Sequence, residues 1–424
     1  MKKVYVEVYG CSSNQGDYEI ALGLLKKANY EIVNEKDSDI NIIFTCSVKT
    51  PTINKILYRI KELTKTRKPL VIAGCLPLTR KRLIEKINKN ASLISPDNVD
   101  GIVKVVKETL NEKKVELLDE KRKPKVNLPR CRKNPLIGIV HIGRGCLSNC
   151  SYCNEPYRGK LFSYSIKEIV KEVKNALNDG CKEIWLTSLD TGCYGFDINT
   201  NLNELLEKIC KLKKKFFVRI GMMNPKYLEI IGKDLMKIVE NEKIFKFLHL
   251  PLQSGSNKML KIMNRGYKVE NFVRYVKKIR KKFPFLTLST DLIVGHPGEE
   301  DKDFKKSLKI IKEIEADIVN VSKFGAHPST LAVKMEKISN EVIKRRSKIL
   351  SEIVKKVSLK RNKKWIGWEG EALIDEIGKN NTLVARNFAY KPIVLKADKK
   401  LFGKFVKVKI KNAMETYLIG EIVN

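Results

Sequence analysis

The sequence predicts an α/β protein in three parts: an N-terminal doubly wound parallel sheet, a central partial (β/α)6 TIM-like barrel, and a C-terminal small all-β barrel. Two observations predict this architecture. Apolar runs alternate with segments of helical periodicity as far as about residue 335, which is typical of parallel sheets. From residue 361 onward, short β-like runs are separated by Gly, Asn and Asp turns. We therefore place an N-terminal domain at 1–110, a linker at 111–134, the barrel at 135–360 and a final domain at 361–424.

The N-terminal domain shows the first strand–helix alternation. Its predicted strands are Val4–Val8, Ile40–Thr45 and Leu70–Ala73, and the helical segments include Ile53–Leu63 and Arg80–Ile87. This order predicts a doubly wound parallel sheet. Residues 111–134 are charged and contain several prolines, which predicts a linker with one edge strand.

The central part contains six strand candidates separated by helical segments, which predicts an open, partial barrel. The predicted strands are Ile137–Ile142, Glu183–Thr187, Phe216–Gly221, Phe245–Leu250, Leu286–Val294 and Ile318–Phe324. The predicted helices include Ser165–Asn178, Leu202–Lys213, Tyr227–Val239, Glu270–Lys281, Asp301–Ile314 and the basic Asn340–Lys360. The final domain follows, with β-like runs at Glu369–Ile374, Thr382–Arg386, Pro392–Leu395, Phe405–Ile410 and Thr416–Val423.

The composition points to a polyanionic partner and a reducing compartment. The 424 residues include 84 basic and 48 acidic side chains, a formal net charge of +36, and such a balance favours nucleic-acid binding. A proteome rich in lysine is the alternative, and the even spread of lysines along the chain fits it. Ten cysteines are too few for a disulfide scaffold in a chain of this length. With no signal-peptide pattern and no apolar run of about 20 residues, we expect a cytoplasmic protein away from membranes.

Three cysteines follow the first barrel strand with the spacing C-x3-C-x2-C, at Cys146, Cys150 and Cys153. A 4Fe-4S cluster has four irons, so three thiolates leave one iron open for a small molecule, which we expect to be S-adenosylmethionine. Gly143 and Gly145 allow a tight turn here. A zinc site is the alternative, but zinc normally has four protein ligands, and no further Cys or His has the spacing. The sequence therefore predicts a 4Fe-4S cluster.

A second trio, Cys11, Cys46 and Cys75, is widely spaced in the sequence. Each cysteine lies at or just beyond the end of a predicted parallel strand, and such ends meet at one edge of a sheet. We therefore expect the three thiols to come together and hold a second 4Fe-4S cluster, also with an open iron, able to bind a group such as sulfide. Three unrelated buried cysteines are the alternative. The other cysteines show no such pattern and are interpreted as structural; they are Cys131, Cys181, Cys193 and Cys210.

Together these features resemble the radical S-adenosylmethionine methylthiotransferase family over nearly the whole chain. The matching segments are Cys11–Asp17, Leu186–Gly192, Tyr194–Gly195, His249–Ser256, Met263–Tyr267 and Thr290–Gly298, and the tail from about residue 361 resembles the RNA-contacting TRAM domain of the family. Within the family, Arg219–Pro225 and Leu186–Gly195 resemble the archaeal and eukaryotic branch that acts on threonylcarbamoyladenosine in tRNA.

The resemblance implies a two-part reaction on the tRNA anticodon loop. The cluster at Cys146, Cys150 and Cys153 would cleave S-adenosylmethionine to a 5′-deoxyadenosyl radical, which removes hydrogen from carbon 2 of the adenine. Sulfur from the second cluster would then be inserted, and a second S-adenosylmethionine would supply the methyl group. An electron donor such as ferredoxin or flavodoxin and a sulfur donor are implied as partners. An aromatic C–H is not acidic, so the hard chemistry belongs to the cofactors. We expect a monomer.

Residues near the strand ends are candidates for binding S-adenosylmethionine. Polar groups after barrel strands can face a cofactor, and the candidates are Gly145, Tyr152, Asp190, Gln253, Ser254 and Asp291. For Asp190 and Asp291, capping of a helix or turn is the alternative. Arg158 is a candidate for a substrate phosphate or carboxylate, with a plain surface role as the alternative.

Four lysines alternate along one predicted strand of the final domain, so we expect them to share a face and contact RNA; they are Lys404, Lys407, Lys409 and Lys411. Most aromatic residues of this domain are expected in its core. Two other functions remain open: a protein methylthiotransferase acting on a ribosomal protein, and a non-catalytic iron–sulfur RNA-binding protein. The strongly basic tail argues against the first, and formation of 5′-deoxyadenosine would exclude the second.

Overall fold

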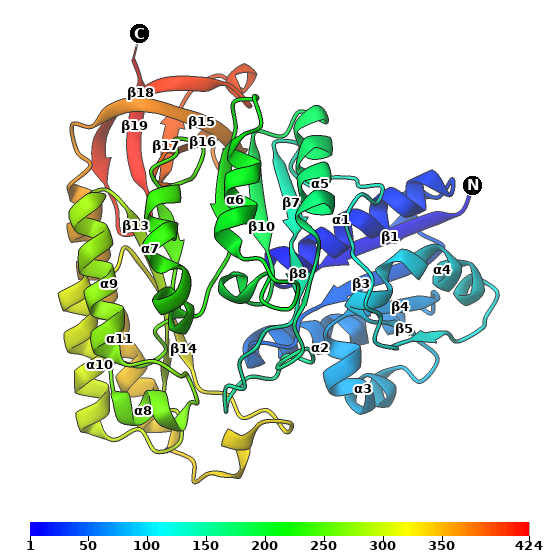
Figure 1. Ribbon diagram of the computed structural model, residues 1–424. Coiled ribbons are helices and arrows are strands. Elements are labelled where there is room, and N and C mark those ends of the chain that lie inside the picture. Colours follow the sequence, from blue (N-terminus) through cyan, green and yellow to red (C-terminus); the bar gives the residue numbers. More distant parts are fainter. Residues whose placement is uncertain (424) are drawn as a thin grey trace.

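The computed structural model describes residues 1–423 and shows three parts (Figure 1). The N-terminal part is a six-stranded parallel sheet in the order β2-β1-β3-β4-β5-β6. Its strands are β1 (Lys3–Val8), β2 (Glu31–Ile32), β3 (Ile40–Thr45), β4 (Leu70–Gly74), β5 (Ser92–Ile94) and β6 (Glu116–Leu117). Its helices are α1 (Ser12–Lys27), α2 (Thr50–Lys65), α3 (Leu76–Ile87) and α4 (Ile102–Leu110). Apolar residues of α1 and α4 pack on one face and those of α2 and α3 on the other, so the sheet is doubly wound as predicted.

The segment predicted to be a linker is packed between the first two parts. Its edge strand β6 completes the N-terminal sheet. Lys125 donates to Asp17 of α1 at 2.6 Å, and Arg130 donates to Glu172 of the barrel helix α5 (Ile166–Asn178) at 2.6 Å. Charged residues of this linker thus form ion pairs with both parts, because a buried charge needs a partner of opposite sign.

The central part is an open parallel barrel. Two three-stranded sheets, β11-β10-β7 and β12-β13-β14, are joined by a parallel bridge between Val218 and Ile244, and within residues 1–423 β7 and β14 do not pair. The strands are β7 (Ile137–His141), β10 (Glu183–Thr187), β11 (Phe217–Ile220), β12 (Phe247–His249), β13 (Thr287–Val294) and β14 (Ile318–Lys323), with a small hairpin of β8 (Gly143–Arg144) and β9 (Phe162–Ser163). The remaining helices are α6 (Leu202–Cys210), α7 (Leu228–Ile238), α8 (Asn257–Ile262), α9 (Val269–Lys282), α10 (Asp301–Ile314) and α11 (Asn340–Lys363).

The C-terminal part is a closed five-stranded barrel in the order β15-β16-β17-β19-β18. Its strands are β15 (Glu369–Ile377), β16 (Thr382–Asn387), β17 (Pro392–Lys396), β18 (Phe405–Ala413) and β19 (Leu418–Ile422). It covers the amino ends of the central strands, where Tyr390 packs against Phe245 and Phe247 with ring centroids 4.9 and 5.1 Å apart. Figure 1 shows it at the top of the central barrel. No helix within the described residues has both the length and the apolar character to cross a membrane.

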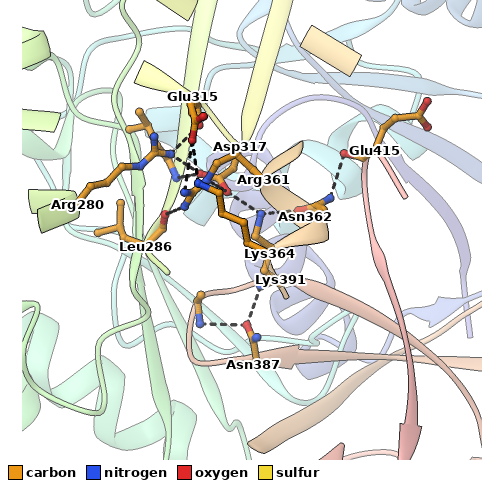
Figure 2. Close-up of polar contacts among 12 residues, drawn as sticks. Arg280, Leu286, Glu315, Asp317, Arg361, Asn362, Lys364, Asn387, Lys391 and Glu415 are labelled. Carbon is orange, nitrogen blue, oxygen red and sulfur yellow. Dashed lines mark hydrogen bonds and ion pairs between the residues drawn. The ribbon is translucent and has the colours of Figure 1, made fainter. Parts of the chain in front are cut away.

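A buried cluster of ion pairs joins the small barrel to the central part (Figure 2). Asp317, at the start of β14, has a fully buried carboxylate. It accepts from Arg280 of α9 at 2.6 Å, Lys391 of the small barrel at 2.9 Å and Arg361 of α11 at 3.2 Å. Burial alone would raise the pKa of Asp317, but the charges of Lys391, Arg361 and Arg280 outweigh it and hold that pKa below its usual range. We call Asp317, Arg280, Arg361 and Lys391 the docking cluster.

Candidate functional site

The cysteines of the central barrel lie together on one loop at the carboxyl end of its first strand. Cys146 and Cys150 are each 6% exposed, and Cys153 is partly exposed. Burial raises the pKa of Cys153 to about 12, and nearby negative charge, including that of the Cys150 and Cys146 thiolates, adds to the rise. The three thiols are therefore close to one another. Burial also raises the pKa of Cys146, and metal binding has to displace the protons of such thiols.

Glycine at position 145 is required by the backbone of this loop. Gly145 has a φ of +74°, and a Cβ there would lie 1.9 Å from the carbonyl oxygen of Lys160. A side chain would thus clash with the segment that leads into β9. The turn predicted from the glycines is present, and it folds the cysteine loop back onto the barrel.

Arg265 is a contact of the cluster site that the sequence reasoning missed. Its buried guanidinium donates from Nη1 to Cys150 Sγ at 3.3 Å and from Nη2 to the carbonyl of Pro251 at 3.0 Å. The guanidinium thus places a positive charge beside one of the predicted cluster ligands. The residue lies in the segment Met263–Tyr267, whose family resemblance is the only sequence signal that pointed to it.

The second trio lies at the carboxyl ends of three adjacent strands, as predicted. Cys11, Cys46 and Cys75 come directly after or close to the ends of β1, β3 and β4, which are neighbours in the sheet. The amide of Cys75 donates to the carbonyl of Thr45 at 3.1 Å. Burial raises the pKa of Cys75 well above its usual range, and negative charge on Glu155, Cys11 and Cys46 raises it further. The three thiols are therefore within electrostatic range of each other.

Asn14 connects the loops that carry this trio. Its side-chain amide donates to the carbonyls of Tyr9 and Thr45, which precede Cys11 and Cys46. A Cβ at Gly74, next to Cys75, would lie 3.0 Å from the Asn14 Oδ1 atom. A single buried side chain thus touches all three loops, and it does so because it sits on the first turn of α1.

That same turn of α1 packs against the barrel. Ser12 Oγ lies 3.0 Å from Thr187 Oγ1 at the end of β10, and the Ser13 carbonyl lies 3.1 Å from His141 Nε2 on β7. Burial lowers the pKa of His141 well below its usual range, so the ring is neutral. These contacts fix the second trio beside the carboxyl ends of the barrel strands, where the first trio lies.

Three cysteines in each trio are the donor set of an iron–sulfur cluster, because each thiolate can bind the iron at one corner of a cubane. The donor set, the tight glycine turn and the arginine at Cys150 therefore fit a 4Fe-4S cluster at the first trio.

Two of the residues predicted to bind S-adenosylmethionine are buried and accept hydrogen bonds from backbone amides. Asp190 is 4% exposed and accepts from the amides of Gly192 and Asn224 at 3.0 and 2.9 Å, so it caps a turn, which is the alternative raised from sequence. Burial raises its pKa to about 6. Ser254 is 1% exposed, and its Oγ accepts from the amide of Ser256 at 3.2 Å.

Gln253 is 9% exposed and has a φ of +68°. Asp291 is held in the barrel by His249 at 3.1 Å and Asn320 at 2.7 Å, with 24% of its side chain exposed. Tyr152 packs edge-on to His296. Contact of these residues with S-adenosylmethionine remains a prediction. Arg158 has a local role that neither sequence alternative foresaw, because it donates to the carbonyls of Cys150 and Cys153.

The four candidate RNA-binding lysines lie on or next to β18. Lys404 and Lys407 are exposed and make no ion pair with another described residue. Lys409 and Lys411 pair with Glu369 and Glu421 at 2.6 and 2.7 Å. The register of β18 against β19 shifts between Ile410 and Asn412, so the simple alternation assumed from sequence is interrupted there.

Comparison with known proteins supports this organisation. Residues 140–311 match the Radical SAM superfamily, residues 3–95 match Uncharacterized protein family UPF0004, and residues 363–423 match the TRAM domain. A "Probable threonylcarbamoyladenosine tRNA methylthiotransferase" of Pyrococcus abyssi is 42% identical, covering all of both chains. The Methanocaldococcus jannaschii protein of the same description is 39% identical, covering 99% of this chain and 97% of that one. The human "Threonylcarbamoyladenosine tRNA methylthiotransferase" is 35% identical, covering all of this chain and 74% of that one.

Solved structures share the fold at low sequence identity. The radical S-adenosylmethionine methyltransferase TsrM from Kitasatospora setae superposes with a TM-score of 0.58 at 12% identity, covering 78% of this chain and 75% of that one. The S-adenosylmethionine radical enzyme OxsB superposes with a TM-score of 0.52 at 11% identity, covering 97% and 65%. These likenesses concern the fold alone.

Proposed function

Because the chain belongs to the radical S-adenosylmethionine methylthiotransferase family, we propose that it converts threonylcarbamoyladenosine beside the tRNA anticodon to its 2-methylthio derivative. The observation that carries the proposal is the meeting of two cysteine trios at one end of the barrel. One trio belongs to the barrel and the other to the N-terminal sheet, and contacts such as Ser12 with Thr187 hold the two domains together there.

The chemistry divides between the cofactors and the chain. When bound, a cluster at each trio and S-adenosylmethionine supply the radical, the sulfur and the methyl group. The chain's own residues bind and orient: the six cysteines are the iron ligands, Arg265 donates to Cys150, and Asn14 holds the loops of the second trio. Electrons are expected from a carrier such as ferredoxin or flavodoxin, and a separate donor replenishes the sulfur.

The small barrel contributes to tRNA binding from the other end of the central barrel. It covers the amino ends of the central strands, whereas both trios lie at carboxyl ends. Its RNA surface therefore binds tRNA away from the base that reacts. Lys404 and Lys407 are the stronger candidates, because their charges are not neutralised by a neighbouring glutamate as those of Lys409 and Lys411 are.

The test is a nucleoside analysis of tRNA treated with the anaerobically reconstituted, reduced protein. With S-adenosylmethionine, sulfide and tRNA that carries threonylcarbamoyladenosine, we expect the 2-methylthio product by mass spectrometry. The matched control is the same tRNA bearing unmodified adenosine. Deleting the gene should remove the product from cellular tRNA. If the product persists in the deletion strain, or if only another modified adenosine is thiolated in vitro, the proposed substrate is wrong.

A further inference from the structure

The helix α11 connects the two ends of the central barrel. Near its start, Arg346 donates to Glu299 at 2.8 Å, in the loop that follows the carboxyl end of β13. Near its end, Asn362 donates to the carbonyl of Met414 in the small barrel at 2.8 Å. Its 24 residues span about 36 Å. The helix is therefore anchored at the carboxyl ends of the strands on one side and at the small barrel on the other.

The exposed side of α11 carries a row of basic residues, which we call the α11 stripe. Its members are exposed and make no ion pair with any residue from 1 to 423; they are Lys344, Arg345, Lys348, Lys355, Lys356 and Lys363. Residues four and seven apart lie on the same side of a helix. Lys344, Lys348 and Lys355 have this spacing, so they form one line along the axis.

The charge of this side of α11 is strongly of one sign. Its exposed acidic residues are Glu341 and Glu352. An ordinary solvated helix face has Lys and Glu interspersed in pairs, whereas like charges one turn apart repel each other. Glu352 is the only acidic residue between Lys344 and Lys363. The stripe therefore presents an excess of positive charge that a polyanion would neutralise.

The stripe is continuous with the candidate RNA surface of the small barrel. α11 packs against β18, which carries Lys407 and directly follows Lys404. Figure 1 shows α11 among the helices on the outside of the central barrel. The small barrel lies at the amino ends of the central strands, and both cysteine trios lie at carboxyl ends. A tRNA that contacts both must therefore pass along the outside of the central barrel.

We propose that the α11 stripe is a second tRNA-binding surface, which holds the phosphate backbone of the substrate between the small barrel and the cysteine trios. The inference rests on the proposed function, because it takes tRNA as the substrate. The basic side chains contact phosphates, so they carry no base specificity and instead set the position of the RNA.

The two anchored ends give this surface a fixed geometry. From Lys344 to Lys363 the stripe is about 28 Å long, at 1.5 Å per residue. Because Arg346 and Asn362 hold the helix at both ends, the row of charges cannot move relative to the barrel or to β18. A backbone bound along the stripe is thereby directed from the small barrel toward the carboxyl ends, where the reacting base has to lie.

The experiment measures the affinity of the full-length, cluster-loaded protein for tRNA as a function of salt concentration. Each phosphate contact contributes roughly 0.7–0.9 to the slope of log K against log salt. The combined variant Lys344→Gln, Lys348→Gln and Lys355→Gln should therefore reduce the magnitude of the slope by about two to three. A reduction of two means that the loss of affinity is about 100-fold larger in about 0.05 M salt than in about 0.5 M salt.

Two matched variants separate this surface from the overall charge of the protein. The variant Lys26→Gln, Lys104→Gln and Lys107→Gln removes the same charge from exposed lysines of α1 and α4, which make no ion pair within the described part of the chain. It should leave the slope unchanged. Arginine at the three stripe positions should also leave it unchanged, because a guanidinium neutralises a phosphate as an ammonium does.

An unchanged slope in the stripe variant would overturn the proposal, as would an equal reduction in the α1 and α4 variant. The stripe would bind a protein instead if its loss leaves tRNA binding unchanged but slows cluster reduction by an acidic carrier such as flavodoxin and not by dithionite. That result also overturns the proposal. Absence of the 2-methylthio product with the wild-type protein would refute the proposed function, and because the slope is measured without thiolation, the two failures are distinguishable.

Discussion

Replacing Asp317 by asparagine tests whether the docking cluster holds the small barrel to the central part. The substitution keeps the shape of the side chain but removes the only negative charge among Asp317, Arg280, Arg361 and Lys391. Its Oδ2 atom accepts from Arg280 at 2.6 Å and from the amide of Leu288 at 3.0 Å. In asparagine one of the two oxygens becomes an NH2 group, so either these donors or those of Lys391 and Arg361 would face another donor.

The expected cost follows from the burial of the cluster. The Asp317 side chain is fully buried, and those of Lys391, Arg361 and Arg280 are 4%, 6% and 14% exposed. Removing one partner of a buried ion pair costs about 3–5 kcal/mol, because the remaining charge is left without compensation. Removing one partner of an exposed ion pair costs only about 0–1 kcal/mol. The exposed pair of Glu421 with Lys411, half exposed on both sides, therefore supplies a matched control in Glu421→Gln.

Native-state hydrogen exchange of the small barrel is the assay, because the cluster joins that barrel to the rest of the chain. A loss of 3–5 kcal/mol in its opening free energy should speed exchange of the β15 and β18 amides by between about two and three and a half orders of magnitude. Exchange in the N-terminal sheet should stay unchanged. If Asp317→Asn speeds exchange by less than about fivefold, or no more than Glu421→Gln, the docking cluster does not stabilise the interface.

Three further predictions concern the cysteine sites and the buried Glu183 of β10, whose carboxylate is affected by Asp375 of β15 in the small barrel. Cys46→Ala should keep 5′-deoxyadenosine formation but lose thiolation; loss of both in a folded, cluster-loaded variant would count against separate roles. Arg265→Met removes a cation 3.3 Å from Cys150 Sγ, which should lower the cluster's reduction potential by on the order of tens of millivolts; an EPR-monitored titration showing no decrease would contradict this. Burial, and then the charge of Asp375, raises the pKa of Glu183. Above about pH 4.3 the native state therefore binds more protons at Glu183 than the unfolded state does, and the free energy of unfolding falls as the pH rises. Glu183→Gln should flatten the decline of Tm between about pH 5 and pH 8, and an unchanged slope would argue against it.

Much of the fold and both cysteine trios were predictable from the sequence, for local reasons. The periodicity of apolar residues is a property of each segment, so strands such as Ile40–Thr45 and Glu183–Thr187 were predicted at the bounds observed. The position of Cys11, Cys46 and Cys75 after strands depends only on local order and on parallel topology, so their place at one edge of the sheet followed as well. The packing of residues 111–134 against both domains was not predictable from the sequence, because the partners of Lys125 and Arg130 are distant in sequence.

The sequence by itself determined the order of the domains, the two cysteine trios that are predicted to hold clusters, and the basic character of the final domain. Only the tertiary structure decided which side chains surround those ligands. Arg265 lies 115 residues from Cys150, Asp317 lies 74 residues from Lys391, and the two lysines Lys409 and Lys411 are paired across strands. These contacts depend on how whole elements pack, and a polar residue carries no local pattern that identifies a distant partner.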